Sequence, residues 1–152
     1  MSQMIIGLAS DHAGFHMKEL VSKFLTKEGF TVKDFGAHSA EDVDYPDFAH
    51  MLAFAIDKQE CTIGFVFCGS GNGVNMAVNK HPHVRSALCW NEEISQLARQ
   101  HNDANVCAIP ARFISANEVL KIVKIFVATK FEGGRHERRV KKIQLPDLTK
   151  RQ

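Results

Sequence analysis

The sequence predicts a single α/β domain built on a five-stranded parallel sheet with helices on both faces. Five short apolar runs alternate along the chain with segments whose apolar residues recur at helical spacing. Each run is almost continuously apolar, which is typical of strands covered on both faces. We expect residues 1–152 to form this one domain, with residues 144–152 as a loose polar tail.

The strands are expected where a short apolar run is bounded by glycine or by polar turn residues. The run MIIGLAS is the first of them, and NVCAIPA is the last. The expected strands cover residues 4–10, 30–36, 62–67, 85–90 and 105–111.

The helices between these strands carry recognisable start and stop signals. Gly29 stops the first helix, and Pro46 fits the first turn of the second. Asn91 can cap the fourth helix, and Ser115 with Glu118 forms a capping box for the fifth. The expected helices cover residues 17–25, 46–56, 74–79, 92–101, 119–128 and 135–143.

The composition excludes several classes of protein. A formal net charge of +2 is too small to indicate nucleic acid or a membrane as the main partner. No apolar stretch approaches the ~20 residues of a membrane span. The stretch MSQMIIGLASDHAG lacks the basic region of a signal peptide. The four cysteines show no CxxC spacing, so we expect free thiols in a reducing, cytoplasmic setting.

The run FVFCGSGNGV, residues 65–74, carries the strongest local signal. Three glycines follow Cys68 within five residues, a composition that suits neither a strand nor a helix. The GxGxxG spacing of dinucleotide-binding folds is missing, and so is the Gly-Lys-Ser/Thr of a P-loop. Two interpretations remain. The loop is either a tight turn, or a cradle of backbone N–H groups that binds a phosphate or a developing oxyanion beside Cys68.

Polar residues also end the other predicted strands. Asp11 and His12 end the first strand, and Arg112 follows the fifth. Ligands collect at the carboxyl ends of strands in open parallel sheets, although an aspartate there is commonly just a helix cap. His12 and His16 have i, i+4 spacing without an accompanying acidic residue, so we expect no metal site.

Two further clusters come late in the chain. His101 and Asn102 end a predicted helix, where a histidine often only offsets the helix dipole. Arg135 and Arg139 share one face of the last predicted helix. This pair is either a solvated basic surface or a clamp for a phosphate group.

Six motifs, in this order and spacing, resemble the type B ribose-5-phosphate isomerases: SDHAGF, VDYP, CGSGNGV, NK, HNDANV and FEGGRHERRV. The wider family includes allose-6-phosphate isomerases and galactose-6-phosphate isomerase subunits, and the resemblance covers Met4 to about Ile143. It implies a Rossmann-like three-layer fold and interconversion of D-ribose 5-phosphate and D-ribulose 5-phosphate in the pentose phosphate pathway. It also implies no metal or other cofactor, and a homodimer or dimer of dimers whose active sites are built from two subunits.

The resemblance further implies a role for each matching residue. Cys68 would be the base that moves a proton between C2 and C1, and His101 the acid that opens the furanose ring. The enediolate oxygens would be held by the backbone of Gly69, Ser70, Gly71, Asn72 and Gly73. The other contacts would come from Asp11 at the ring, Asn102 at the sugar hydroxyls, Tyr45 in the pocket wall, and His12, Arg112, Arg135 and Arg139 at the phosphate.

Two departures from the family pattern bear on these roles. Ser70 stands where many members have threonine, which keeps the hydroxyl group. Some members lack the cysteine and use a carboxylate a few residues later, but residues 75–77 are Asn, Met and Ala here. This favours Cys68 as the base. The alternatives are an allose-6-phosphate or galactose-6-phosphate isomerase (subunit), or a non-catalytic sugar-phosphate-binding module.

Overall fold

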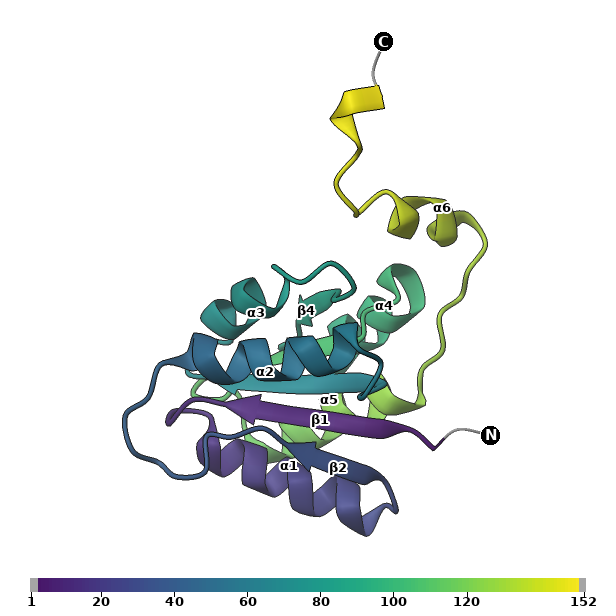
Figure 1. The fold of residues 1–152 in the computed structure, drawn as a ribbon. Coiled ribbons are helices and arrows are strands. Elements are labelled where there is room, and N and C mark those ends of the chain that lie inside the picture. Colours follow the sequence, from purple (N-terminus) through teal and green to yellow (C-terminus); the bar gives the residue numbers. More distant parts are fainter. Residues whose placement is uncertain (1–2, 151–152) are drawn as a thin grey trace.

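The computed structural model describes residues 3–150 and contains the predicted five-stranded, all-parallel sheet (Figure 1). The strands are β1 Ile5–Ser10, β2 Thr31–Asp34, β3 Ile63–Cys68, β4 Ser86–Leu88 and β5 Val106–Pro110. They lie in the order β2-β1-β3-β5-β4, so β3 is the central strand and β2 and β4 are the edge strands. Each expected strand is therefore present, within a few residues of its expected limits.

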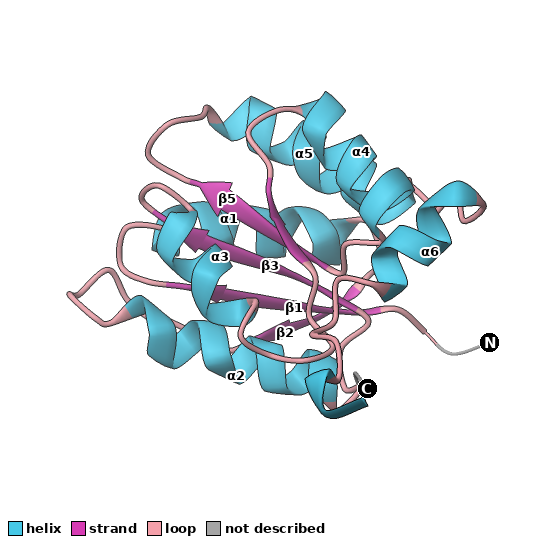
Figure 2. Cartoon of the chain, turned by 90° about the horizontal axis from the view of Figure 1, so that it is seen from above, coloured by secondary structure: helices cyan, strands magenta, loops and turns pink. Residues whose placement is uncertain are grey.

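Helices cover both faces of the sheet, as the apolar runs predicted (Figure 1; Figure 2). The helices are α1 Phe15–Lys27, α2 Tyr45–Asp57, α3 Asn72–Val78, α4 Glu92–Asn102, α5 Ala116–Ala128 and α6 Arg135–Lys141. Side chains of the strands pack with those of α1, α4 and α5 on one face of the sheet and with those of α2 and α3 on the other. No helix within residues 3–150 is long and apolar enough to cross a lipid bilayer.

The predicted helix signals act at the expected places. The side chain of Asn91 accepts a hydrogen bond from the N–H of Ile94 at 2.9 Å, and Ser115 Oγ accepts one from the N–H of Glu118 at 3.2 Å. Gly29 follows α1 with a φ of +90°, a conformation that glycine adopts without strain. These caps set where each helix begins or ends relative to the sheet.

The side chains of β3 alternate between the two faces and determine where Cys68 points. Phe65 and Phe67 are buried against the α1, α4 and α5 layer, whereas Val66 and Cys68 pack on the side of α2 and α3. Replacing one such buried phenylalanine by alanine costs about 3–5 kcal/mol. The sulfur of Cys68 is thus directed to the layer that contains the first turns of α2 and α3.

One strand is shorter than the sequence predicted. The fourth strand is only three residues long because the chain leaves this edge of the sheet to start α4, which Asn91 caps. The predicted tail is described as far as residue 150, and it includes a short 3₁₀ turn at Leu148–Lys150. Figure 1 shows this segment leading away from the sheet after α6.

Candidate active site

The glycine loop after β3 is shaped around the Cys68 thiol. Cys68 ends β3, and its Sγ accepts a hydrogen bond from the N–H of Gly71 at 3.1 Å. Gly71 has a φ of +76°, and a Cβ on it would lie 2.6 Å from Leu88 Cδ1 and 3.1 Å from the nitrogen of Pro110. Only glycine fits there. The bare backbone therefore brings an amide hydrogen to the sulfur.

Two predicted site residues line the same loop. A Cβ on Gly73 would lie 2.5–2.9 Å from the Tyr45 ring, so that ring rests directly against the loop. The Arg112 side chain passes Gly69 in the same way, and its backbone N–H donates to the carbonyl of Gly69 at 3.1 Å. The loop is consequently flanked by one aromatic ring and one guanidinium group.

Asp11 and His12 lie on the neighbouring strand end. Asp11 is buried, its N–H donates to the carbonyl of Phe67 at 3.3 Å, and its Oδ1 accepts from the N–H of Gly14 at 3.0 Å. Asp11 thus closes the turn before α1, but it is not the helix cap, because the N-cap residue of α1 is Gly14 and no side chain caps it. The structure brings the following residues together at the carboxyl ends of the strands: Asp11, His12, Tyr45, Arg112 and residues 68–73.

The His12 ring is held by the segment before α2. Its Nδ1 accepts the N–H of Val43 at 3.3 Å, so the proton of the neutral ring is on Nε2, which faces Asp42 Oδ1 at 2.9 Å. Asp42 is 95% exposed and was not singled out from the sequence. An arriving anion would therefore compete with Asp42 for His12.

The remaining predicted residues lie near the opposite ends of the strands. We call the side of the sheet with the amino ends of the strands its amino edge, and the side with the carboxyl ends its carboxyl edge. His101 and Asn102 end α4 just before β5 begins, whereas Cys68 pairs with Pro110 at the far end of β5. The five residues from Gly64 to Cys68 span roughly 13 Å, far beyond hydrogen-bond reach. Helix α6, which carries Arg135 and Arg139, lies at this amino edge in both views (Figure 1; Figure 2). Within one chain the predicted residues therefore form two half-sites.

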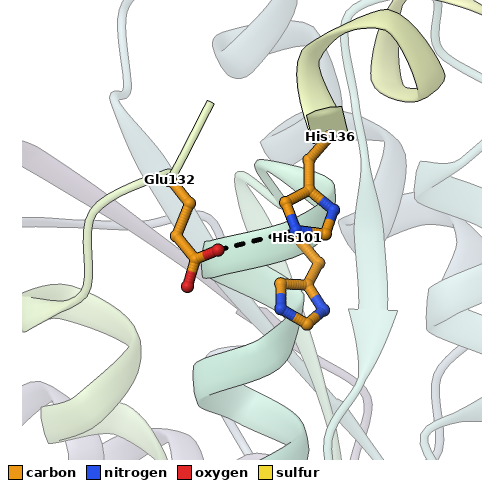
Figure 3. Close-up of side chains that lie close together, drawn as sticks. All are labelled: His101, Glu132 and His136. Carbon is orange, nitrogen blue, oxygen red and sulfur yellow. Dashed lines mark ion pairs between the residues drawn. The ribbon is translucent and has the colours of Figure 1, made fainter. Parts of the chain in front are cut away.

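The amino-edge half-site contains a stacked pair of histidines that the sequence analysis did not identify (Figure 3). The rings of His101 and His136 are parallel within 11°, with centroids 4.2 Å apart. His136 Nε2 lies 3.5 Å from Glu132 Oε2. Burial, and then the nearby cations of His101, Arg135 and Arg139, lower the pKa of His136 despite the opposing effect of Glu132. The i, i+4 spacing of Glu132 and His136 was the available sequence signal.

His101, Glu132 and His136 each offer one possible ligand atom for a metal ion. The nearest ligand atoms of His101, Glu132 and His136 lie within 4.8 Å of one another. In stacked rings, however, the nitrogen lone pairs lie in parallel planes and do not converge on one ion. Positively charged Arg135 and Arg139 close by also oppose a cation. The arrangement does not fit a metal centre, and we assign none to it.

Two of the three arginines of α6 are the ones predicted to bind a phosphate. Arg135 and Arg139 are exposed, and within residues 3–150 neither has an ion-pair partner. Both positive charges lie close enough to His136 to lower its pKa. Such a pair of unpaired cations is suited to a phosphate group.

Comparison with known proteins shows which family the chain belongs to. The model of the ribose/galactose isomerase family matches residues 6–143. The chain belongs to this family. Ribose-5-phosphate isomerase B of Escherichia coli is 37% identical over 138 residues, which cover 91% of this chain and 93% of that protein.

Solved structures of this family are closely similar to the chain. Ribose-5-phosphate isomerase from Thermotoga maritima superposes with a TM-score of 0.91 and 43% identity, covering 94% of this chain and 99% of that one. Ribose-5-phosphate isomerase B of Mycoplasma genitalium, solved with bound ribulose 5-phosphate, has a TM-score of 0.89 and 41% identity, covering 94% and 95%. The three-layer fold predicted from the sequence is thereby confirmed.

Proposed function

We propose that this family member interconverts D-ribose 5-phosphate and D-ribulose 5-phosphate as an aldose–ketose isomerase of the pentose phosphate pathway. The observation that carries the proposal is the Cys68 thiol at a strand end, hydrogen-bonded to the N–H of Gly71 in a loop that tolerates no side chain there. The relatives named for this activity, one of them solved with ribulose 5-phosphate, support it. The buried, unpaired thiols suit a reducing, cytoplasmic setting.

Cys68 is the base of the proton transfer. Its thiolate removes the proton from C2 of the open aldose, and the electron pair forms the C1=C2 bond of an enediolate. The same proton returns to C1 while the hydroxyl proton moves from O2 to O1, which leaves the ketose. Backbone N–H groups of residues 69–73 stabilise the charged oxygens of the intermediate, because such donors are already in position when the charge develops.

Ring opening precedes this step and needs an acid. The C1–O4 bond of the furanose breaks, O4 takes a proton from His101, and the C1 hydroxyl gives its proton to a carboxylate. Asp11 is the carboxylate at the carboxyl edge, buried beside the end of β3. Asn102 contacts the sugar hydroxyls, and Tyr45 forms the wall of the pocket.

The phosphate is bound by His12, Arg112, Arg135 and Arg139. Because the first two lie at the carboxyl edge of the sheet and the last two at the amino edge, the phosphate site requires two chains. Since one chain holds Cys68 and His101 at opposite edges of its sheet, the complete site forms where the carboxyl edge of one copy meets the amino edge of another. A homodimer with two-fold symmetry makes two such sites at once. A dimer of dimers would repeat the arrangement.

A direct assay tests the proposal. Purified protein is given ribose 5-phosphate and allose 6-phosphate side by side, and ketose formation is followed. We expect ribose 5-phosphate to be converted with the higher kcat/KM. Preference for allose 6-phosphate would make the chain a six-carbon isomerase, and binding of both sugars without turnover would make it a non-catalytic module.

A further inference from the structure

The main chain of His101 is held firmly by the residue two positions later. Asp103 has a φ of +46° and ends α4. Its carboxylate lies 3.2 Å from Arg85 Nη2 and 3.2 Å from Arg99 Nη1, and Arg85 Nε donates to its carbonyl at 2.8 Å. Two arginines from different parts of the chain therefore lock the turn that carries His101.

The fixed main chain does not determine the direction of the His101 ring, because the side-chain torsions remain free to rotate. Among the described residues, no hydrogen bond reaches either ring nitrogen of His101. The contact that remains is the stack on His136, with the centroids 4.2 Å apart. The orientation of the His101 ring therefore depends on where His136 lies.

His136 is well suited to be a fixed platform. It is 7% exposed, so it is enclosed by protein, and its Nε2 faces Glu132 Oε2 at 3.5 Å. The N–H of Glu132 donates to the carbonyl of Gln100 at 3.1 Å, which ties the Glu132 segment to the end of α4. The platform and the ring that it supports are thus linked to the same helix end.

We propose that His136, oriented by Glu132, is a positioning residue that holds the His101 imidazole in the direction needed for ring opening. The inference rests on the proposed function, since it assigns a residue to one step of that reaction. Stacking leaves both ring nitrogens of His101 free in the plane of the ring, where one can face the furanose oxygen. A lone side chain would sample several rotamers, and few of them would be productive.

The protonation of the stack fits this role. A positive charge on His136 would repel a positive charge on His101 at this distance. Burial and the nearby cations lower the pKa of His136, which favours its neutral form near pH 7. The His136 ring therefore adds no positive charge beside the ring assigned as the acid.

The chemistry of the two sugars provides a test that separates positioning from general damage. Ribose 5-phosphate is a furanose and must be opened. Ribulose 5-phosphate is acyclic, because its phosphate occupies the only hydroxyl that could close a furanose ring onto C2. Loss of ring opening should therefore slow the initial rate from aldose to ketose much more than the initial rate from ketose to aldose. Damage to folding, phosphate binding or the base would slow both directions together.

The experiment measures both initial rates for wild type, His136→Ala, His136→Phe, Glu132→Gln and His101→Asn, with His16→Ala as a surface control. A positioned acid raises a reaction rate about 10²–10⁴-fold, so we expect His101→Asn to lower the initial rate from aldose to ketose by this factor. His136→Ala should lower the initial rate from aldose to ketose about 10-fold, and the initial rate from ketose to aldose less than about twofold. His136→Phe keeps a flat ring and should recover most of the loss, and Glu132→Gln should fall between.

The outcomes distinguish the inference from the proposed function. A wild-type protein that isomerises neither sugar would overturn both. If His101→Asn slows both directions equally, the ring-opening role of His101 is wrong. If His101→Asn shows the asymmetry, but His136→Ala leaves both rates unchanged or lowers both equally, the positioning role of His136 is refuted. Asymmetry in His136→Ala that is not reduced in His136→Phe would equally refute stacking as its cause.

Discussion

Two inactive variants of this chain should restore each other's activity when they share a dimer. Cys68→Ala removes the base from the carboxyl edge, and His101→Asn removes the acid from the amino edge. Each variant alone should lose about 10²–10⁴-fold in the conversion of ribose 5-phosphate, the usual worth of a positioned acid or base. Since the two edges are separated by roughly 13 Å of strand, no site can form within one chain.

The recovered activity follows from counting sites. In a dimer that contains one copy of each variant, one site combines the intact Cys68 of one chain with the intact His101 of the other. The second site has neither group. Random pairing of equal amounts makes about half of the dimers mixed, so about a quarter of the wild-type sites should be restored in a symmetric dimer.

The assay uses two distinguishable affinity tags. The variants are co-expressed, mixed dimers are isolated on both tags in succession, and ketose formation from ribose 5-phosphate is measured. Purified mixed dimers should reach about half of the wild-type kcat with an unchanged KM. Mixed dimers as inactive as the parents would show that Cys68 and His101 act within one chain, and the two-chain site would be wrong. A fully active monomer would lead to the same conclusion.

Three further outcomes are expected. Arg139→Ala should raise KM for the sugar phosphate by the equivalent of about 2–5 kcal/mol through loss of a charged contact, whereas Arg138→Ala on the same helix should have a much smaller effect; equal effects would refute the clamp. Iodoacetamide at neutral pH should modify Cys68 first, with substrate slowing the reaction, because burial raises the pKa of the Cys107 thiol well above its usual range; peptide mapping that finds Cys107 labelled first would contradict this. Because the pKa of His136 is lowered on folding, the unfolded chain binds more protons, so the free energy of unfolding should fall as the pH drops below about 6.5. His136→Phe should show a weaker decline in urea titrations at pH 7.5 and 5.5, and an identical decline would show that other groups cause it.

Local patterns in the sequence were sufficient to predict the architecture and the kinds of residue that form the candidate site. Continuous apolar runs predicted buried parallel strands, and the glycines after Cys68 predicted a backbone that could approach a ligand. These signals are local: an apolar period, a capping residue or a conformational requirement is readable within a few neighbours. The limits of β4 were less certain, because an edge strand ends where the following helix begins.

Which residues lie together in one site is seen only in the folded chain. Sequence spacing cannot show that His101 and Cys68 lie at opposite edges of the sheet, since this depends on the direction in which each element crosses it. Nor does it show that His136, 35 positions from His101, stacks on that ring. The pairing of Asp42 with His12 is likewise a contact between separate loops. Packing sets these relations, because each helix buries its apolar side chains against one face of the sheet.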